Sequence, residues 1–124
     1  MIDALANVCE QSSNYKVRSG CILALGELES VAHLSLIQKS LLSPHKREQT
    51  FAIIASGLIG DSRAIESLLS VYVNATEDYV KSDIIIALSR MKNTDDAQSA
   101  LVGILEKETD EVLIKTVKSK LAEL

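Results

Sequence analysis

One stretch of the chain decides the fold: Val17-Arg18-Ser19-Gly20-Cys21-Ile22-Leu23-Ala24-Leu25-Gly26-Glu27-Leu28. A shift of 63 positions lays the start of this stretch on Val80-Lys81-Ser82 and its Ala24-Leu25 pair on Ala87-Leu88. A shift of 31 lays Ala24, Gly26 and Leu28 on Ala55, Gly57 and Ile59. A chain that matches itself at such a period indicates a repeat architecture.

The same repeat extends outward in both directions from this stretch. At the shift of 63, Ile2, Leu5 and Val8 match Ile65, Leu68 and Val71. At a shift of 32, Ala32, Leu36 and Ile37 match Ala64, Leu68 and Leu69, and His33 falls on Ile65. A weaker fourth copy includes Leu113, Val117 and Leu121. The unit is therefore about 32 residues long.

Each unit is predicted to form two helices. In the clearest unit, Ser43-Pro44 has the pattern of an N-cap followed by proline at the first helical position. Apolar residues then recur at helical spacing until Gly60, which suits a left-handed C-terminal residue, and Asp61-Ser62 and Thr76 suit the caps of the next helices. Eight helices are expected, at residues 2–11, 15–28, 31–42, 45–59, 63–74, 77–91, 95–106 and 110–123.

Helices of this length with short connections pack as antiparallel hairpins, and a hairpin buries its apolar face by stacking on its neighbours. We therefore expect an all-α, right-handed α-solenoid of about four hairpins. Residues 1–124 form one repeat domain, either alone or as a segment of a longer array. The repeated Gly26 and Gly57 are expected to let the paired helix come close. The amphipathic end helices leave open a monomer or weak end-to-end self-association.

The composition excludes several classes of protein. Of 124 residues, 47% are hydrophobic and 24% are charged, which is too apolar for a disordered chain. Two cysteines are too few for a disulfide-stapled secreted module. The longest apolar stretch, at residues 51–60, is half of the roughly 20 residues that a membrane span needs. We expect a cytoplasmic protein that does not interact with membranes.

The repeat resembles a known family. The stretch 17–28 resembles the V-R-x-x-A-A-x-A-L-G-x-I signature of short HEAT-like repeats, and residues 60–69 resemble the G-D-x-x-A-I-x-x-L segment that follows it. The subtype is the one named after phycobilisome lyase subunits. The resemblance covers essentially the whole chain and implies the fold rather than a particular function.

Two enzyme families that share this architecture are not matched. Deoxyhypusine hydroxylases carry His-Glu dipeptides that bind a di-iron centre, whereas the histidines here are followed by Leu34 and Lys46. HEAT-like DNA glycosylases have a basic, aromatic-lined face, whereas this chain has a net charge of −4 and no tryptophan. We therefore expect a non-catalytic scaffold that binds a protein or peptide, not nucleic acid. The alternative is an accessory domain or subunit of a lyase-like enzyme complex, with catalysis supplied elsewhere.

The candidate binding residues are those that the second helix of each unit is expected to present on a concave face. One row of equivalent positions holds Asp3, Leu34, Glu66 and Gln98, and a second holds Asn7, Gln38, Ser70 and Val102. A third row is Ala4, Ser35, Ser67 and Ser99. Small, weakly charged residues of this kind suit either a groove for a protein segment or an ordinary solvated face.

The remaining reactive residues favour structural roles. Cys9 and Cys21 lie six residues either side of Tyr15, a symmetry that a redox pair or disulfide would use. We expect two small core residues instead, since Cys21 aligns with an alanine position of the repeat family. His33 is expected to be partly buried and His45 solvated, and neither has neighbours at metal-ligand spacing. No cofactor is expected. Acidic pairs stand where the helix dipole favours negative charge, at Glu77-Asp78, Asp95-Asp96 and Asp110-Glu111.

Overall fold

The computed structural model describes residues 2–92 and 94–124. Within them it contains eight α-helices and no strand, which confirms the predicted all-α fold. The helices are α1 (Ile2–Gln11), α2 (Tyr15–Glu27), α3 (Leu34–Leu41), α4 (Lys46–Ile59), α5 (Ser62–Asn74), α6 (Asp78–Ser89), α7 (Thr94–Lys107) and α8 (Glu111–Glu123). A 3-10 turn, η1 (Val31–His33), leads into α3.

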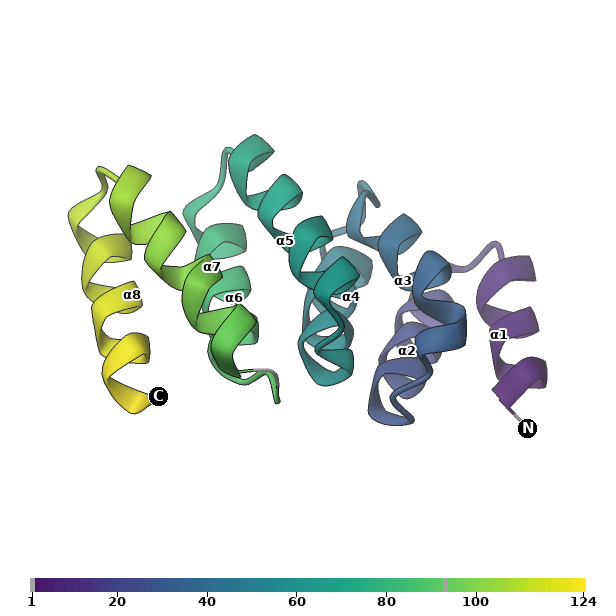
Figure 1. Ribbon diagram of the computed structural model, residues 1–124. Coiled ribbons are helices and arrows are strands. Elements are labelled where there is room, and N and C mark those ends of the chain that lie inside the picture. The colour runs from purple at the N-terminus through teal and green to yellow at the C-terminus, as the bar shows by residue number, and fades with distance from the viewer. Residues whose placement is uncertain (1, 93) are drawn as a thin grey trace.

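The helices form two layers that run the length of the molecule. We call α2, α4, α6 and α8 the first-helix layer, because each packs on the next of that set, and α1, α3, α5 and α7 the second-helix layer. Figure 1 shows α3, α5 and α7 in front of α2, α4 and α6, with the two chain termini at opposite ends of the array. The arrangement confirms an α-solenoid of stacked helical hairpins.

The hydrophobic core lies between the two layers and continues from unit to unit. Ile22 and Leu25 of α2, Ile37 of α3, Ile53 of α4 and Leu68 of α5 are all fully buried. Farther along, the core continues through Ile84, Ile85, Leu88, Leu101, Leu113 and Val117. Because each unit contributes only a few aliphatic side chains, the core is a continuous layer rather than one globular centre.

The helix ends confirm some of the predicted caps and contradict others. Gly60 is left-handed, with φ 65°, and Asp61 accepts a hydrogen bond from the Arg63 amide at 2.8 Å. The cap predicted at Ser43-Pro44 is wrong, since α4 begins at Lys46 after His45. The cap predicted at Thr76 is also wrong, because Glu77 precedes α6.

The three acidic pairs lie at helix starts, as predicted. Asp110 is a full N-cap whose carboxylate accepts the amides of Val112 and Leu113 at 2.9 and 3.1 Å. Asp78 and Asp95 lie in the first turns of α6 and α7, where the helix dipole favours negative charge.

Gly26 permits a close approach of two helices, though not of the two expected. A Cβ atom at Gly26 would lie 2.6 Å from the Cα atom of Ala55, which is on α4. The helix that comes close is therefore the next member of the first-helix layer, whereas the sequence predicted the paired helix α3. A Cβ atom at Gly57 would likewise lie 3.1 Å from the carbonyl oxygen of Ala87, on α6.

The alignment of the second helices corrects one predicted register. Leu34, Ile37 and Leu41 are buried as Ile65, Leu68 and Tyr72 are, so the spacing between α3 and α5 is 31 residues. The predicted spacing of 32 matched Ala32 with Ala64 by residue type, yet Ala32 is exposed and Ala64 is fully buried. Residue type alone predicted the wrong alignment of α3 with α5, because alanine and leucine recur at neighbouring positions of the repeat.

Candidate functional site

The second-helix layer carries three grooves at equivalent places in successive units. Each is lined by two consecutive helices of that layer and by the loop that follows the second of them. The α1–α3, α3–α5 and α5–α7 grooves have volumes of about 440, 290 and 550 Å³. Their recurrence follows from the repeat, because equivalent helix ends leave equivalent gaps.

A long polar side chain at an equivalent position of the first-helix layer lines each groove: Arg18, Gln49 or Lys81. Each is tethered to the end of the preceding second helix. Arg18 Nη1 donates to the Ser12 carbonyl at 3.0 Å, and Gln49 Nε2 donates to the Leu41 carbonyl at 3.1 Å. Lys81 Nζ lies over the Tyr72 ring, 5.3 Å from its centroid. The three tethers fix the shapes of the grooves.

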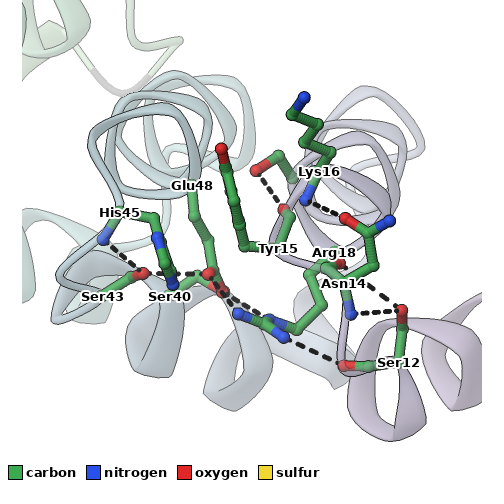
Figure 2. A network of polar contacts seen from close by, with 10 residues as sticks. Ser12, Asn14, Tyr15, Lys16, Arg18, Ser40, Ser43, His45 and Glu48 are labelled. Atoms are coloured by element: carbon green, nitrogen blue, oxygen red, sulfur yellow. Dashed lines mark hydrogen bonds and ion pairs between the residues drawn. The ribbon is translucent and has the colours of Figure 1, made fainter.

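In the α1–α3 groove, Arg18 forms a two-point ion pair with Glu48, shown in Figure 2. Arg18 Nε and Nη2 donate to the Glu48 carboxylate at 3.1 and 2.9 Å. Ser40 and Ser43 also donate to that carboxylate, at 3.0 and 2.9 Å. The Glu48 side chain is 6% exposed and that of Arg18 is 24% exposed. The network therefore joins α2, α3 and α4 through a buried carboxylate with several donors.

The electrostatics of Glu48 reflect two opposing effects. Burial alone would raise the pKa of the Glu48 carboxyl. The hydrogen bonds from Arg18, Ser43 and Ser40, with the positive charge of Arg18, outweigh burial and lower that pKa below its usual value. Glu48 is therefore ionised at neutral pH, which suits a structural ion pair rather than a proton-transfer group.

Sequence reasoning missed this network, although the sequence holds a signal for it. By the spacing of Gly26 and Gly57, Glu48 stands where the preceding unit has Val17, and the following unit has Val80 in that place. A carboxylate at an apolar position of a repeat indicates a buried partner, here Arg18. Beside the network, the rings of Tyr15 and His45 stack with centroids 4.1 Å apart.

The α5–α7 groove is the largest of the three, and Tyr72 forms part of its wall. The Tyr72 hydroxyl donates to Glu108 at 2.5 Å, and the amides of Thr109 and Asp110 donate to the same carboxylate, each at 3.1 Å. Burial and the nearby carboxylates raise the pKa of the Tyr72 hydroxyl. The hydrogen bond that Tyr72 donates lowers the pKa of the Glu108 carboxyl. The negative charge of Glu108 is therefore stabilised by three hydrogen-bond donors of the chain itself. Two basic residues, Lys81 and Lys107, also line the groove.

Two large apolar side chains at the groove rims are unusually exposed. Leu42, which lines the first two grooves, is 79% exposed, and Val73, which lines the third, is 81% exposed. They lie 31 residues apart, at equivalent positions after or near the ends of α3 and α5. Exposed apolar side chains at a groove are typical of an interaction surface.

The eight predicted binding residues all lie on helices of the second-helix layer, but one of them is buried. Six of them are exposed: Asp3, Asn7, Glu66, Ser70, Gln98 and Val102. Gln38 is half-buried, and its amide donates to Ser67 Oγ at 2.9 Å. Leu34 is 3% exposed and belongs to the core. Its predicted place in an exposed row is wrong, because the spacing between α3 and α5 is 31 residues and not the predicted 32. In the third row, Ala4, Ser35 and Ser99 are exposed and Ser67 is half-buried.

These rows meet the grooves in two places. Ser70 lines the α3–α5 groove, and Ser99 lines the α5–α7 groove. Gln98 and Val102 lie with Ser99 around a shallower depression on α7. The row residues Asp3, Asn7 and Glu66 line none of these hollows.

The two cysteines are neighbouring buried thiols. Burial, together with a hydrogen bond to Cys21, raises the pKa of the Cys9 thiol to about 12. Both cysteines are free, which agrees with their predicted place in the core. A thiol with so high a pKa is a poor nucleophile, because the reactive form is the thiolate.

The histidines take part in local contacts. His33 is half-buried, as predicted, and its Nδ1 shares a hydrogen bond of 2.7 Å with Ser30 Oγ. Its Nε2 lies 3.5 Å from the carboxylate of Asp3. Over residues 2–92 and 94–124, no three His, Cys, Asp or Glu side chains are grouped so that they could hold a metal ion. Within the same residues, no helix has the length and apolar character needed to cross a membrane.

The two layers and the stacked hairpins define an α-solenoid. A family model for HEAT repeats matches residues 2–89, and the chain belongs to the HEAT repeat family. No curated protein matches the chain. HEAT repeats generally serve as protein-interaction scaffolds, and the family is typically non-catalytic. The resemblance to the phycobilisome-lyase subtype stays a prediction.

Proposed function

We propose that this protein is a non-catalytic scaffold that binds an extended segment of a protein partner along the second-helix layer, on the concave side of the solenoid. The observation that carries the proposal is the recurrence of the three grooves at equivalent positions, with Leu42 and Val73 exposed at their rims. A row of similar grooves suits a chain segment, which can place one side chain in each.

The spacing of the grooves is compatible with an extended peptide. Neighbouring packed helices lie about 8–10 Å apart, and an extended chain advances about 3.3 Å per residue. A bound segment would therefore move from one groove to the next in about three residues. We expect the partner to carry apolar side chains at that interval.

The α5–α7 groove indicates the chemistry of the partner. Its wall includes the apolar side chains of Leu69, Val73 and Ile104. Lys81 and Lys107 lie on the same lining, whereas the Glu108 carboxylate already accepts three hydrogen bonds. The groove therefore favours an apolar side chain next to an acidic one.

A peptide selection tests the proposal. Peptides would be selected from a random library on the purified chain, and their affinities measured by calorimetry for the wild type and for Leu42→Asp with Val73→Asp. We expect the double variant to lose at least about tenfold in affinity, equal to about 1.4 kcal/mol. The matched control is Val112→Asp, which changes a 70% exposed valine on α8 in the first-helix layer.

Further variants distinguish binding at the groove rims from binding at the exposed rows predicted from sequence. The combined change of Glu66, Ser70 and Gln98 to arginine tests the rows predicted from sequence, since all three side chains are exposed. Lys81→Glu should weaken acidic peptides more than neutral ones. Peptides that bind all these variants as well as the wild type would contradict the proposal, provided that circular dichroism shows each variant folded.

The accessory-subunit alternative differs from this proposal only in the partner, which would then be an enzyme. The chain would bind that enzyme through the same grooves and supply no reacting group. A rise in the enzyme's activity on addition of this chain, lost with the Leu42→Asp and Val73→Asp pair, would distinguish the alternative.

A further inference from the structure

The first-helix layer has a groove of its own, between α4 and α6. Its volume is about 290 Å³, and its lining is mostly apolar, with Ile54, Leu58 and Ile86 on either side of Gly57. Ile54 and Leu58 are 43% and 40% exposed. This α4–α6 groove lies on the layer opposite the three grooves of the proposed function, so a partner bound there would leave those three grooves free.

Two opposite charges lie in the α4–α6 groove, and both lack partners within the part of the chain that the structure describes. Asp83 is half-buried, and burial raises the pKa of its carboxyl. Neither Asp83 nor the exposed Arg90 side chain forms an ion pair or side-chain hydrogen bond with another described residue. The two are seven residues apart on or just after α6, or about 10 Å along its axis.

These residues form one stripe along the helix. Asp83, Ile86, Ala87 and Arg90 follow the i, i+3, i+4, i+7 spacing that places side chains on one face. The apolar pair Ile86 and Ala87 is at the middle of the stripe, and the opposite charges are at its two ends. Reversing the direction of the helix therefore exchanges a negative end for a positive one.

We infer that this stripe binds a second copy of the same chain, with the two α6 helices antiparallel across a two-fold axis. Such an axis, passing between Ile86 and Ala87, brings Asp83 of each copy opposite Arg90 of the other. Both unpaired charges then gain partners, and the same axis sets α4 of each copy opposite α4 of the other, so that the exposed Ile54 and Leu58 of the two copies cover one another. Two-fold interfaces require this kind of self-complementary surface.

The inference is independent of the proposed function, because it uses a different layer and a different partner. It also differs from end-to-end association, which would use the outer faces of α1 and α8 and would build chains longer than a dimer. A dimer through α6 leaves the second-helix layer of both copies open to a protein segment.

The test is a charge exchange followed by sedimentation velocity over a series of protein concentrations. The wild type should show a monomer–dimer equilibrium. Asp83→Arg and Arg90→Asp, made singly, should each weaken dimerisation at least about tenfold, since each places like charges opposite each other twice. The double variant, Asp83→Arg with Arg90→Asp, should regain most of the lost affinity because the charges are then exchanged.

Matched controls carry the same changes of charge on the opposite layer. Glu66→Arg and Lys39→Glu alter exposed residues of α5 and α3 and should leave the dimer unchanged. A wild type that stays monomeric at every concentration would overturn the inference, as would a double variant no better than the singles. Species larger than a dimer that ignore both single changes would indicate end-to-end association instead. Circular dichroism of each variant separates loss of pairing from loss of folding.

Discussion

Two junctions in the first-helix layer share a sequence motif and differ in how closely they pack. At the α2–α4 junction, a Cβ on Gly26 would be 2.6 Å from the Cα of Ala55, so the backbones touch. At the α4–α6 junction, a Cβ on Gly57 would be 3.1 Å from the nearest atom, the carbonyl oxygen of Ala87. Beside Gly57 the surface stays open as the α4–α6 groove.

The more closely packed α2–α4 junction also has the stronger polar contacts. Arg18 and Glu48 join α2 to α4 through a two-point ion pair. At α4–α6 the equivalent residues are Gln49 and Val80, and Gln49 turns instead to the Leu41 carbonyl. The comparison shows that the shared glycine fixes which helix faces come together, while the residues around it decide how closely they pack.

Removing the Arg18–Glu48 ion pair should lower the free energy of unfolding more than the glycine substitutions described below. Glu48→Ala should lower the free energy of unfolding by about 3 kcal/mol, because it leaves the guanidinium of Arg18 partly buried without its partner. Equilibrium unfolding in urea measures the change. Arg63→Ala is the control, since it removes an ion pair to Asp61 from a 61% exposed side chain and should cost far less than Glu48→Ala. Equal losses in the two variants would contradict the special role of the α2–α4 junction.

Acid should remove part of the same stabilisation. The folded-state pKa of Glu48 is lowered, so its contribution is complete above the unfolded pKa of about 4.3 and is lost as the pH falls through the folded value. We expect the difference in unfolding free energy between the wild type and Glu48→Gln to shrink as the pH falls from neutral to about 3. A difference that stays constant over that range would show that the charge of Glu48 does not stabilise the fold.

The two glycines should respond differently to the same methyl group. Gly26→Ala should cost about 2 kcal/mol, because the added Cβ meets the backbone of Ala55. Gly57→Ala should cost at least about 1 kcal/mol less, since Ala87 needs to move only slightly. Thermal unfolding of both variants compares them directly, and a larger loss for Gly57→Ala would show that the α4–α6 junction is the tighter of the two.

A third glycine provides the smallest effect, of opposite sign. Gly20 lies on α2 as Gly26 does, but a Cβ there would have nothing within 4 Å. Gly20→Ala should raise the free energy of unfolding by about 0.5–1 kcal/mol, because alanine loses less backbone entropy than glycine on folding into a helix. If urea unfolding shows Gly20→Ala to be destabilising, the helix surface at this position is not free.

Much of the fold could be predicted from the sequence because its signals are local. Apolar periodicity and punctuation such as Gly60-Asp61 place all eight helices to within a few residues. The close approach at Gly26 was expected, but its partner helix was not, since one chain repeated in tandem offers several similar faces to the same glycine.

The candidate site was predictable only in part. The exposed rows on the second helices were found, with Leu34 misplaced by one residue. The grooves depend on where helix ends and loops meet, which periodicity does not report. The Arg18–Glu48 pair was missed because its two members are 30 residues apart and each, taken alone, has the character of a surface residue.

The ion pair also bears on how the chain avoids folding wrongly. Similar hairpins in tandem can pair with the wrong neighbour, which is a characteristic failure of repeat proteins. If α2 docked on α6 instead of α4, the guanidinium of Arg18 would face Val80, the residue that stands in the place of Glu48. The uncompensated charge would penalise that arrangement. Arg18 and Glu48 thus identify α4 as the correct neighbour of α2 among helices that otherwise look alike.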